Sequence, residues 1–148
     1  MSNYQVIAAI NAKFHVAHDR LESIHHETTI PIEAHQLHEV VALLLEQMKI
    51  THLTTITAQV MEEPLDNLQV YYQFWHGEGL TLAIQLPAEN PQLPSITDMI
   101  PGADFYEREV AEMFGIAFTG RKTTPPLLLP DDWDAEPPMR RKAGETNG

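Results

Sequence analysis

Prolines gather near the carboxyl end of this sequence, and they limit what that end can form. Five of the 11 prolines fall between residues 125 and 138. Proline fixes its own φ angle and pushes the preceding residue toward extended geometry, so we expect little helix there. The leucines at 127–129 and Trp133 are too apolar for a purely solvated tail. We therefore predict an extended arm over residues 121–148 that docks against something, preceded by a domain over residues 1–120.

The preceding residues alternate between helical and β patterns. Apolar residues at helical spacing predict a helix over residues 3–14 and a second, more regular helix from Glu33 to Met48. Runs rich in β-branched or alternating apolar residues predict strands over 28–32, 51–60, 68–76 and 80–86. The glycines of His76-Gly77-Glu78-Gly79 indicate a hairpin between the last two strands. This order is typical of an α+β domain with helices packed on one face of a small mixed or antiparallel sheet.

The segment from Pro94 to Gly120 carries several helix signals. Ser95 and Asp98 form a capping-box pattern that predicts a helix start, which Pro101-Gly102 then interrupts. A second helix is predicted from Ala103 to Phe114, and Gly115 stands where a helix often ends. We expect its apolar stripe to consist of Phe105, Tyr106, Val110, Met113 and Phe114.

Three consecutive charged residues, Glu107, Arg108 and Glu109, lie inside this second helix. Successive helical residues point about 100° apart, so the two glutamates lie on different faces and one of the three should face inward or toward a partner. The alternative is a solvated face with an Arg108–Glu112 pair worth a few tenths of a kcal/mol.

Composition excludes several classes of function. The 148 residues contain no cysteine, which excludes thiolate nucleophiles, cysteine-ligated zinc and iron–sulfur clusters held by this chain in the usual way. The net charge of −12, mostly carried up to Asp104, argues against binding a phosphate backbone. The longest apolar run, Val40 to Leu45, is far below the ~20 residues that span a bilayer. The first residues lack the basic start of an export signal, so we expect membrane contact only through another protein.

Four motifs occur together in the last third of the sequence. They are P-S-I-T at 94–97, A-D-F-Y-E-R-E at 103–109, M-F-G-I-A-F at 113–118 and L-L-P-D-D-W at 128–133. In this order and spacing they resemble the small hydrophilic C-type subunit, of the 30 kDa type, of respiratory complex I, the NADH:quinone oxidoreductase. That family is related to a subunit of energy-converting membrane-bound hydrogenases. Residues 138–141 match the basic ending of the family loosely.

The resemblance implies a non-catalytic structural and assembly subunit in the hydrophilic arm of such a proton-translocating complex. It implies no active site, metal or redox cofactor in this chain. Iron–sulfur clusters, and a flavin or nickel–iron centre, are expected in partner subunits. The expected partners are the D-type subunit that helps to form the quinone site and the cluster-bearing B- and I-type subunits. The expected location is the cytoplasmic side of the cell membrane, peripheral through the complex.

The resemblance also implies that the charged triplet and the arm contact the partner. Buried aromatic and arginine side chains dominate interface energies, so Trp133 and the leucines would be apolar anchors, and Arg140 and Arg141 would clamp carboxylates or carbonyls. The predicted interface residues are Glu107, Arg108, Glu109, Phe114, Leu128, Leu129, Asp131, Asp132, Trp133, Arg140 and Arg141.

Two other functions remain open at this point. One is the equivalent subunit of a membrane-bound [NiFe] hydrogenase. The other is a stand-alone metalloenzyme that uses the histidines concentrated in the first 40 residues. His35 and His38 are one helical turn apart, a spacing that a metal can use. They lie beside the buried stripe and do not converge with a carboxylate, so a solvated or partner-facing role is favoured. Asp131, Asp132 and Asp134 lack the spacing of an EF-hand loop.

Overall fold

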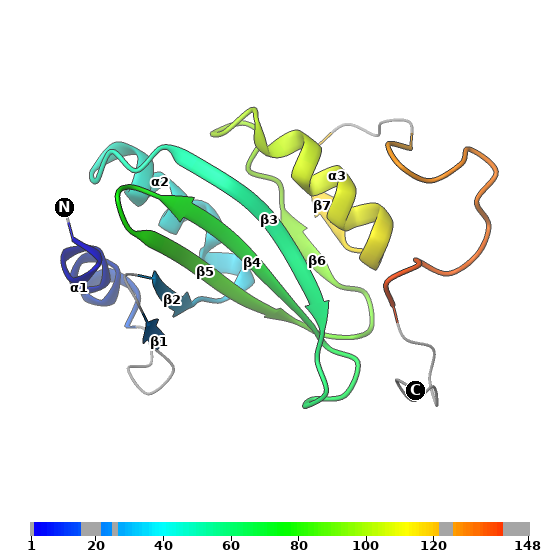
Figure 1. Cartoon of the computed structure of the whole chain (residues 1–148), viewed down its shortest axis with the longest axis horizontal. Helices are drawn as coiled ribbons and strands as arrows, with labels where there is room; N and C mark the ends of the chain where they lie inside the picture. The colour runs from blue at the N-terminus through cyan, green and yellow to red at the C-terminus, as the bar shows by residue number, and fades with distance from the viewer. Residues whose placement is uncertain (1, 16–21, 25–26, 122–125, 141–148) are drawn as a thin grey trace.

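A mixed five-stranded sheet organises the chain (Figure 1). The computed structural model describes residues 2–15, 22–24, 27–121 and 126–140. In chain order the elements are α1 (Asn3–Phe14), β1 (Glu22–Ile24), β2 (Glu27–Pro31), the 3-10 helix η2 (Ala34–Gln36), α2 (Leu37–Glu46), β3 (His52–Val60), β4 (Leu68–Trp75), β5 (Gly79–Leu86), β6 (Gln92–Pro94), α3 (Ala103–Phe114) and β7 (Ala117–Thr119).

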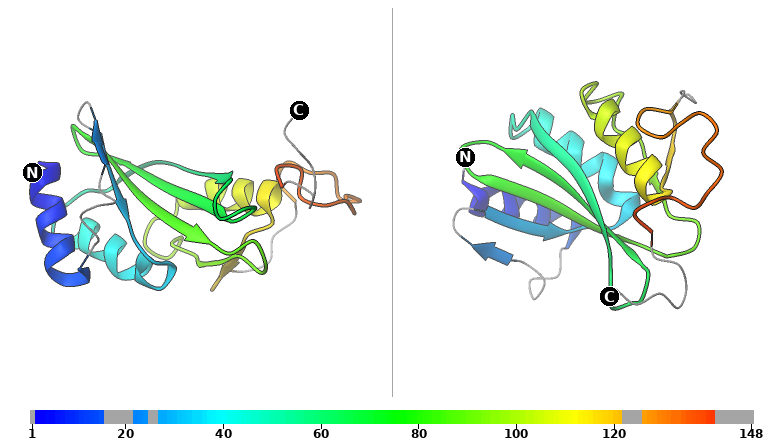
Figure 2. Two further views of the ribbon diagram at one scale, coloured as in Figure 1. Left: turned by 90° about the horizontal axis from the view of Figure 1, so that it is seen from below. Right: turned by 45° about the vertical axis from the view of Figure 1, so that its right-hand side comes forward.

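The sheet has the order β1-β2-β5-β4-β3, and only its β2–β5 pair is parallel. β4 and β5 form the expected hairpin, with Trp75 opposite Gly79 at its closed end. The left view of Figure 2 shows the three α-helices on one side of this sheet, with α1 and α3 toward opposite ends. The prediction of an α+β fold with helices on one face of a small mixed sheet is therefore confirmed.

The core lies between that face of the sheet and the helices. Alternate residues of β4, from Leu68 to Phe74, are buried, while the residues between them are only partly buried. The stripe predicted on the second helix is confirmed, because Leu37, Val40, Val41 and Leu44 are all fully buried. Side chains two apart on a strand, and three or four apart on a helix, share a face, which explains both patterns. None of the helices in the described ranges is long and apolar enough to cross a membrane.

Asn3 attaches α1 to the hairpin. Ser2 caps the helix, and the next side chain, Asn3, is buried. The Asn3 amide nitrogen Nδ2 donates to Thr28 Oγ1 at 3.1 Å and to the Gly79 carbonyl at 2.9 Å. Its backbone N–H donates to the Glu78 carboxylate, and its Oδ1 lies 2.6 Å from His76 Nε2. The polar residues of the hairpin turn therefore hold the first helix in place.

Several local expectations differ from the structure. The helix start predicted at Ser95 does not form, because Ser95 Oγ bonds to Glu107 and Thr97 while residues 95–102 form a loop with turns. The predicted second helix begins with the 3-10 turn η2 and ends at Glu46. Phe105, which we expect in the buried stripe, is instead 49% exposed, with its ring edge-to-face against Tyr106. The short strands β1, β6 and β7, of three residues each, are not predicted by the sequence pattern.

Tyr72 offers a test of the core. Its ring is fully buried, and its hydroxyl has no hydrogen-bond partner among the described residues. Leaving a buried hydroxyl without a partner costs roughly 1–3 kcal/mol. We expect Tyr72→Phe to raise the free energy of unfolding by about 1 kcal/mol, measured by urea denaturation.

The neighbouring Tyr71 is the matched control. It lies on the opposite face of β4, and its hydroxyl accepts a hydrogen bond from Gln59 Nε2 at 2.9 Å. Tyr71→Phe should therefore leave stability unchanged or slightly lower. A larger loss of stability in Tyr72→Phe than in Tyr71→Phe would contradict this account of the core.

Candidate functional site

The strands β6 and β7 bring the ends of two segments together beside α3. They pair in parallel, with Pro94 opposite Thr119, and the Ser95 N–H donates to the Thr119 carbonyl at 2.9 Å. Carboxyl ends of parallel strands meet at the same edge, so the residues that follow β6 and β7 emerge side by side. The connecting helix α3 carries Glu107 to this point.

The Glu107 carboxylate joins those two segments. It is fully buried. Its Oε1 accepts from the Ser95 hydroxyl at 2.7 Å and from Arg121 Nη1 at 3.1 Å, and its Oε2 accepts from the Ile96 N–H at 2.8 Å. Arg121 also pairs with Asp104 on the first turn of α3. A buried carboxylate is tolerated only with such compensation, so these contacts are a condition of the fold.

Burial and hydrogen bonding act on Glu107 in opposite directions. Burial raises the pKa of the Glu107 carboxyl above its usual value, while the Ile96 N–H, the Ser95 hydroxyl and Arg121 lower it, and burial dominates. Burial also raises the pKa of Tyr72 well above its usual value, with a further contribution from the charge of Glu107. The charge of Glu107 on α3 is therefore felt by Tyr72 on the sheet.

The charged triplet is divided between the interior and the surface. The expectation that one of its three residues faces inward is confirmed for Glu107. We expected Glu107 to make an ion pair at an interface, but its partner is Arg121 of the same chain. Arg108 and Glu109 are partly exposed, and Arg108 Nη1 lies 3.8 Å from Asp104. The spacing Ala103–Glu107–Val110–Phe114 follows the buried side of α3 and was the signal that could have placed Glu107 inside.

The arm contacts the end of α3 in its own chain. The Glu112 carboxylate accepts the backbone N–H groups of Leu127 and Leu128, the second at 2.7 Å. Arg140 donates to the carbonyls of Phe114 and Ala88, although we expected it to clamp groups of a partner. Arg141 lies outside the described residues.

The remaining predicted interface residues differ in exposure. The Phe114 ring lies in the core, whereas Leu128 and Trp133 are 50% and 43% exposed. Leu129 is partly exposed, and Asp131 and Asp132 are exposed. Their contacts with a partner stay predictions.

The histidines within the described ranges do not gather in one place. His38 lies with its Nε2 at 2.8 Å from the Ser95 carbonyl and at 3.6 Å from the Asp98 carboxylate, so it connects α2 to the loop that Glu107 holds. His35 is exposed on η2. His18, His25 and His26 fall outside the described residues. Among the residues that are described, no three histidine or carboxylate side chains come together as metal ligands.

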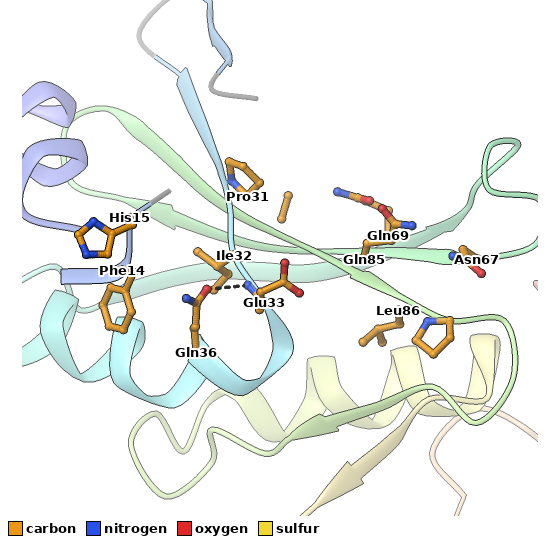
Figure 3. A pocket seen from close by; sticks show the side chains of 12 residues that line it. Phe14, His15, Pro31, Ile32, Glu33, Gln36, Asn67, Gln69, Gln85 and Leu86 are labelled. Atoms are coloured by element: carbon orange, nitrogen blue, oxygen red, sulfur yellow. Dashed lines mark hydrogen bonds between the residues drawn. The ribbon is translucent and has the colours of Figure 1, made fainter. Parts of the chain in front are cut away.

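A groove of about 740 Å³ runs along the end of β2. Figure 3 shows Phe14 and His15 at one end of it and Asn67 and Leu86 at the other. Between them the lining is mostly apolar or amide, and the amide of Gln36 accepts the Glu33 N–H at 2.9 Å. The ionisable residues of the lining are His15 and Glu33, and Figure 3 shows them apart from one another.

Fold and site together define the class. The protein is a small α+β domain built around a buried carboxylate, with a carboxyl-terminal segment that returns to its last helix. The chain belongs to the family described as respiratory-chain NADH dehydrogenase, 30 Kd subunit, whose model matches residues 30–147.

Curated relatives agree with this family. The chain is 41% identical to the C subunit of NADH-quinone oxidoreductase from Roseiflexus castenholzii over 64 residues, which are 43% of this chain and 37% of that protein. It is 29% identical to the C subunit from Acidothermus cellulolyticus over 117 residues, 75% of this chain and 61% of that protein. A third relative, from Gluconacetobacter diazotrophicus, is named as a C/D subunit, with 46% identity over 61 residues, 41% of this chain and 10% of that protein.

The fold is also similar to a solved structure. A trypsin-resistant fragment (1–134) of Nqo5 superposes with a TM-score of 0.70 at 24% identity, covering 84% of this chain and all of that fragment. At this identity the likeness concerns the fold. The chain spans little more than a third of the length of the Roseiflexus relative and 30% of the corresponding protein of Salinispora tropica.

The buried carboxylate predicts a pH dependence. The pKa of Glu107 is raised in the folded protein above that of a glutamate in an unfolded chain, which is ~4.3. The folded state therefore holds this proton more tightly, and the stability gained from protonation is lost as the pH rises through the folded pKa. Relative to Glu107→Gln, the wild-type protein should lose free energy of unfolding as the pH rises from about 4 toward neutrality.

Urea unfolding of both proteins at several pH values measures this difference, in which the titration of most other groups cancels. A difference that grows in favour of the wild-type protein with rising pH would show that Arg121 and the hydrogen bonds outweigh burial, and it would contradict the dominance of burial at Glu107.

Proposed function

We propose that this chain is a non-catalytic structural and assembly subunit in the hydrophilic arm of a complex I-type NADH:quinone oxidoreductase. In this proposal it packs against the D-type subunit at the quinone site. Family membership carries the proposal. The Roseiflexus and Acidothermus relatives are subunits of NADH-quinone oxidoreductases, which favours this complex over a membrane-bound hydrogenase.

The C/D relative supports the choice of partner. Its name joins a C-type and a D-type part in one protein, and the matching stretch is a small share of that protein. Two parts joined in one chain are held at high effective concentration, an arrangement that suits domains which work in contact. Contacts with cluster-bearing B- and I-type subunits are a further part of the proposal.

A structural role fits the chemistry of the described residues. The carboxylate with the most perturbed surroundings, Glu107, is engaged on both oxygens by groups of its own chain. The groove at β2 offers amides and apolar groups. We infer that electrons and protons move through centres in the partner subunits, while this chain positions those subunits on the cytoplasmic side of the membrane.

Trp133 is the anchor that we expect to matter most at the interface. It is 43% exposed in the arm, and its Nε1 donates to the Glu136 carbonyl at 3.3 Å, which fixes the orientation of the ring. Truncating a central aromatic anchor typically costs 2 kcal/mol or more, so Trp133→Ala should weaken binding to the D-type subunit by roughly thirtyfold. Biolayer interferometry, with this chain immobilised and the purified D-type subunit titrated, measures the dissociation constant.

The other tryptophan of the chain is the matched control. Trp75 is 52% exposed at the closed end of the β4–β5 hairpin, beside α1 and away from the arm. Trp75→Ala should bind as the wild-type chain does. Equal losses in the two variants would count against docking through the arm, and no binding by the wild-type chain would count against the proposed function itself.

A further inference from the structure

The arm is fixed to α3 at its beginning. The Glu112 carboxylate accepts the N–H groups of two consecutive residues, Leu127 and Leu128. Hydrogen bonds to an ionised carboxylate are roughly twice as strong as those between neutral groups. The start of residues 126–140 is therefore held against the last turns of α3.

The arm is fixed again at its end, on the same helix. Arg140 Nη1 donates to the Phe114 carbonyl at 3.2 Å, and Nη2 donates to the Ala88 carbonyl at 2.6 Å. The Met139 N–H donates to the Met113 carbonyl at 2.8 Å. The last carbonyls of a helix lack partners within the helix and carry partial negative charge, so a guanidinium and an N–H are well suited to them.

Gly115 allows the returning chain to come this close. Its φ is +73°, a conformation that glycine adopts without strain. A Cβ at this position would lie 2.8 Å from Pro137 Cγ. The glycine thus serves both to end α3 and to admit the returning segment.

The two anchors close the arm into a loop that leaves α3 and returns to it (Figure 1). The loop exposes two large hydrophobic side chains, Leu128 at the first anchor and Trp133 between the anchors. A third, Met139, is 55% exposed beside the second anchor. The carboxylates of the loop, Asp131, Asp132, Asp134 and Glu136, are all exposed. Arg140 is the one basic residue within 126–140, and its guanidinium is occupied by the two carbonyls.

We propose that residues 126–140 form a docking loop that is already shaped in the free subunit, with Glu112 and Arg140 as its two anchors. Its occupant is a D-type surface with an apolar pocket for Trp133 and Leu128 and a rim of arginine or lysine facing the four carboxylates. A basic rim on the partner is expected because it would complement the four exposed carboxylates of the loop. A loop shaped before binding also avoids the ordering cost of a segment that folds on its partner. The inference rests on the proposed function for the identity of the partner.

Hydrogen exchange of the free subunit tests whether the loop is shaped in advance. The amides of Leu127, Leu128 and Met139 should exchange at least about tenfold more slowly than in an unstructured peptide. Glu112→Ala should remove this protection at Leu127 and Leu128. The matched control is Glu46→Ala, which removes an exposed glutamate near the end of α2 and should change nothing at these amides.

Binding to the D-type subunit at several salt concentrations tests the partner. Asp131→Asn with Asp132→Asn should reduce the salt dependence of the association rate. Glu112→Ala should keep that dependence and weaken affinity by about tenfold through lost preorganisation.

Two results would overturn the inference, and they are distinguishable. Fast exchange at Leu127 and Leu128 in the free wild-type subunit, with protection only in the complex, would show that the loop folds on binding, and the proposed function would stand. Slow exchange in the free subunit without any binding to the D-type subunit would show that the loop is shaped in advance. It would contradict both the D-type partner and the proposed function.

Discussion

A single buried carboxylate determines how the carboxyl-terminal half of this protein is arranged. Glu107 receives hydrogen bonds from the loop that follows β6 and from the arginine that follows β7. The hydrophobic core can hold α3 against the sheet, but apolar contacts have no direction and leave those two segments free. Hydrogen bonds to the carboxylate are directional and fix the positions of both segments, but burying its charge costs free energy. The charge is tolerated because each oxygen accepts at least one hydrogen bond.

The position of the arm follows from this arrangement. Arg121 is the first residue of the arm, and its guanidinium is held by Glu107 and Asp104. The arm is then held by Glu112 and by the helix end to which Arg140 returns. Three acidic residues of α3 thus bind Arg121 and the start of residues 126–140. The 12 residues of α3 supply core side chains, the buried Glu107 and the anchor Glu112.

Sequence patterns predicted the elements whose periodicity is regular. The stripe of α2 and the alternation in β4 depend only on neighbours along the chain, so they could be interpreted without the fold. The role of Ser95 could not be predicted in this way. Its hydroxyl can cap a helix or donate to Glu107, and only the tertiary structure decides between the two. The prediction that one residue of the triplet faces inward was right, but it did not say which one. The spacing of the buried residues from Ala103 to Phe114 identifies Glu107 as that residue.

The arm shows a second limit of sequence patterns. Prolines and leucines predicted a segment without helix that docks, and docking on a partner stays a prediction. They did not reveal that residues within 126–140 contact the end of α3. That contact joins Glu112 and Gly115 at the end of α3 to residues far along the chain, among them Arg140. Backbone N–H and carbonyl groups make the bonds, and these groups carry no sequence signal. The short strands β6 and β7 were missed for a different reason, because three residues are too few to establish a period.

The hydrogen bond from the Ile96 N–H to Glu107 joins the segment after β6 to α3, and amide exchange at Ile96 measures it directly. Ile96 lies outside any helix or strand. If the buried carboxylate holds this segment, the Ile96 amide should exchange as slowly as the amides of β4 in the core, opening only when the whole domain unfolds. Exchange as rapid as that of an exposed loop would contradict the role assigned to Glu107.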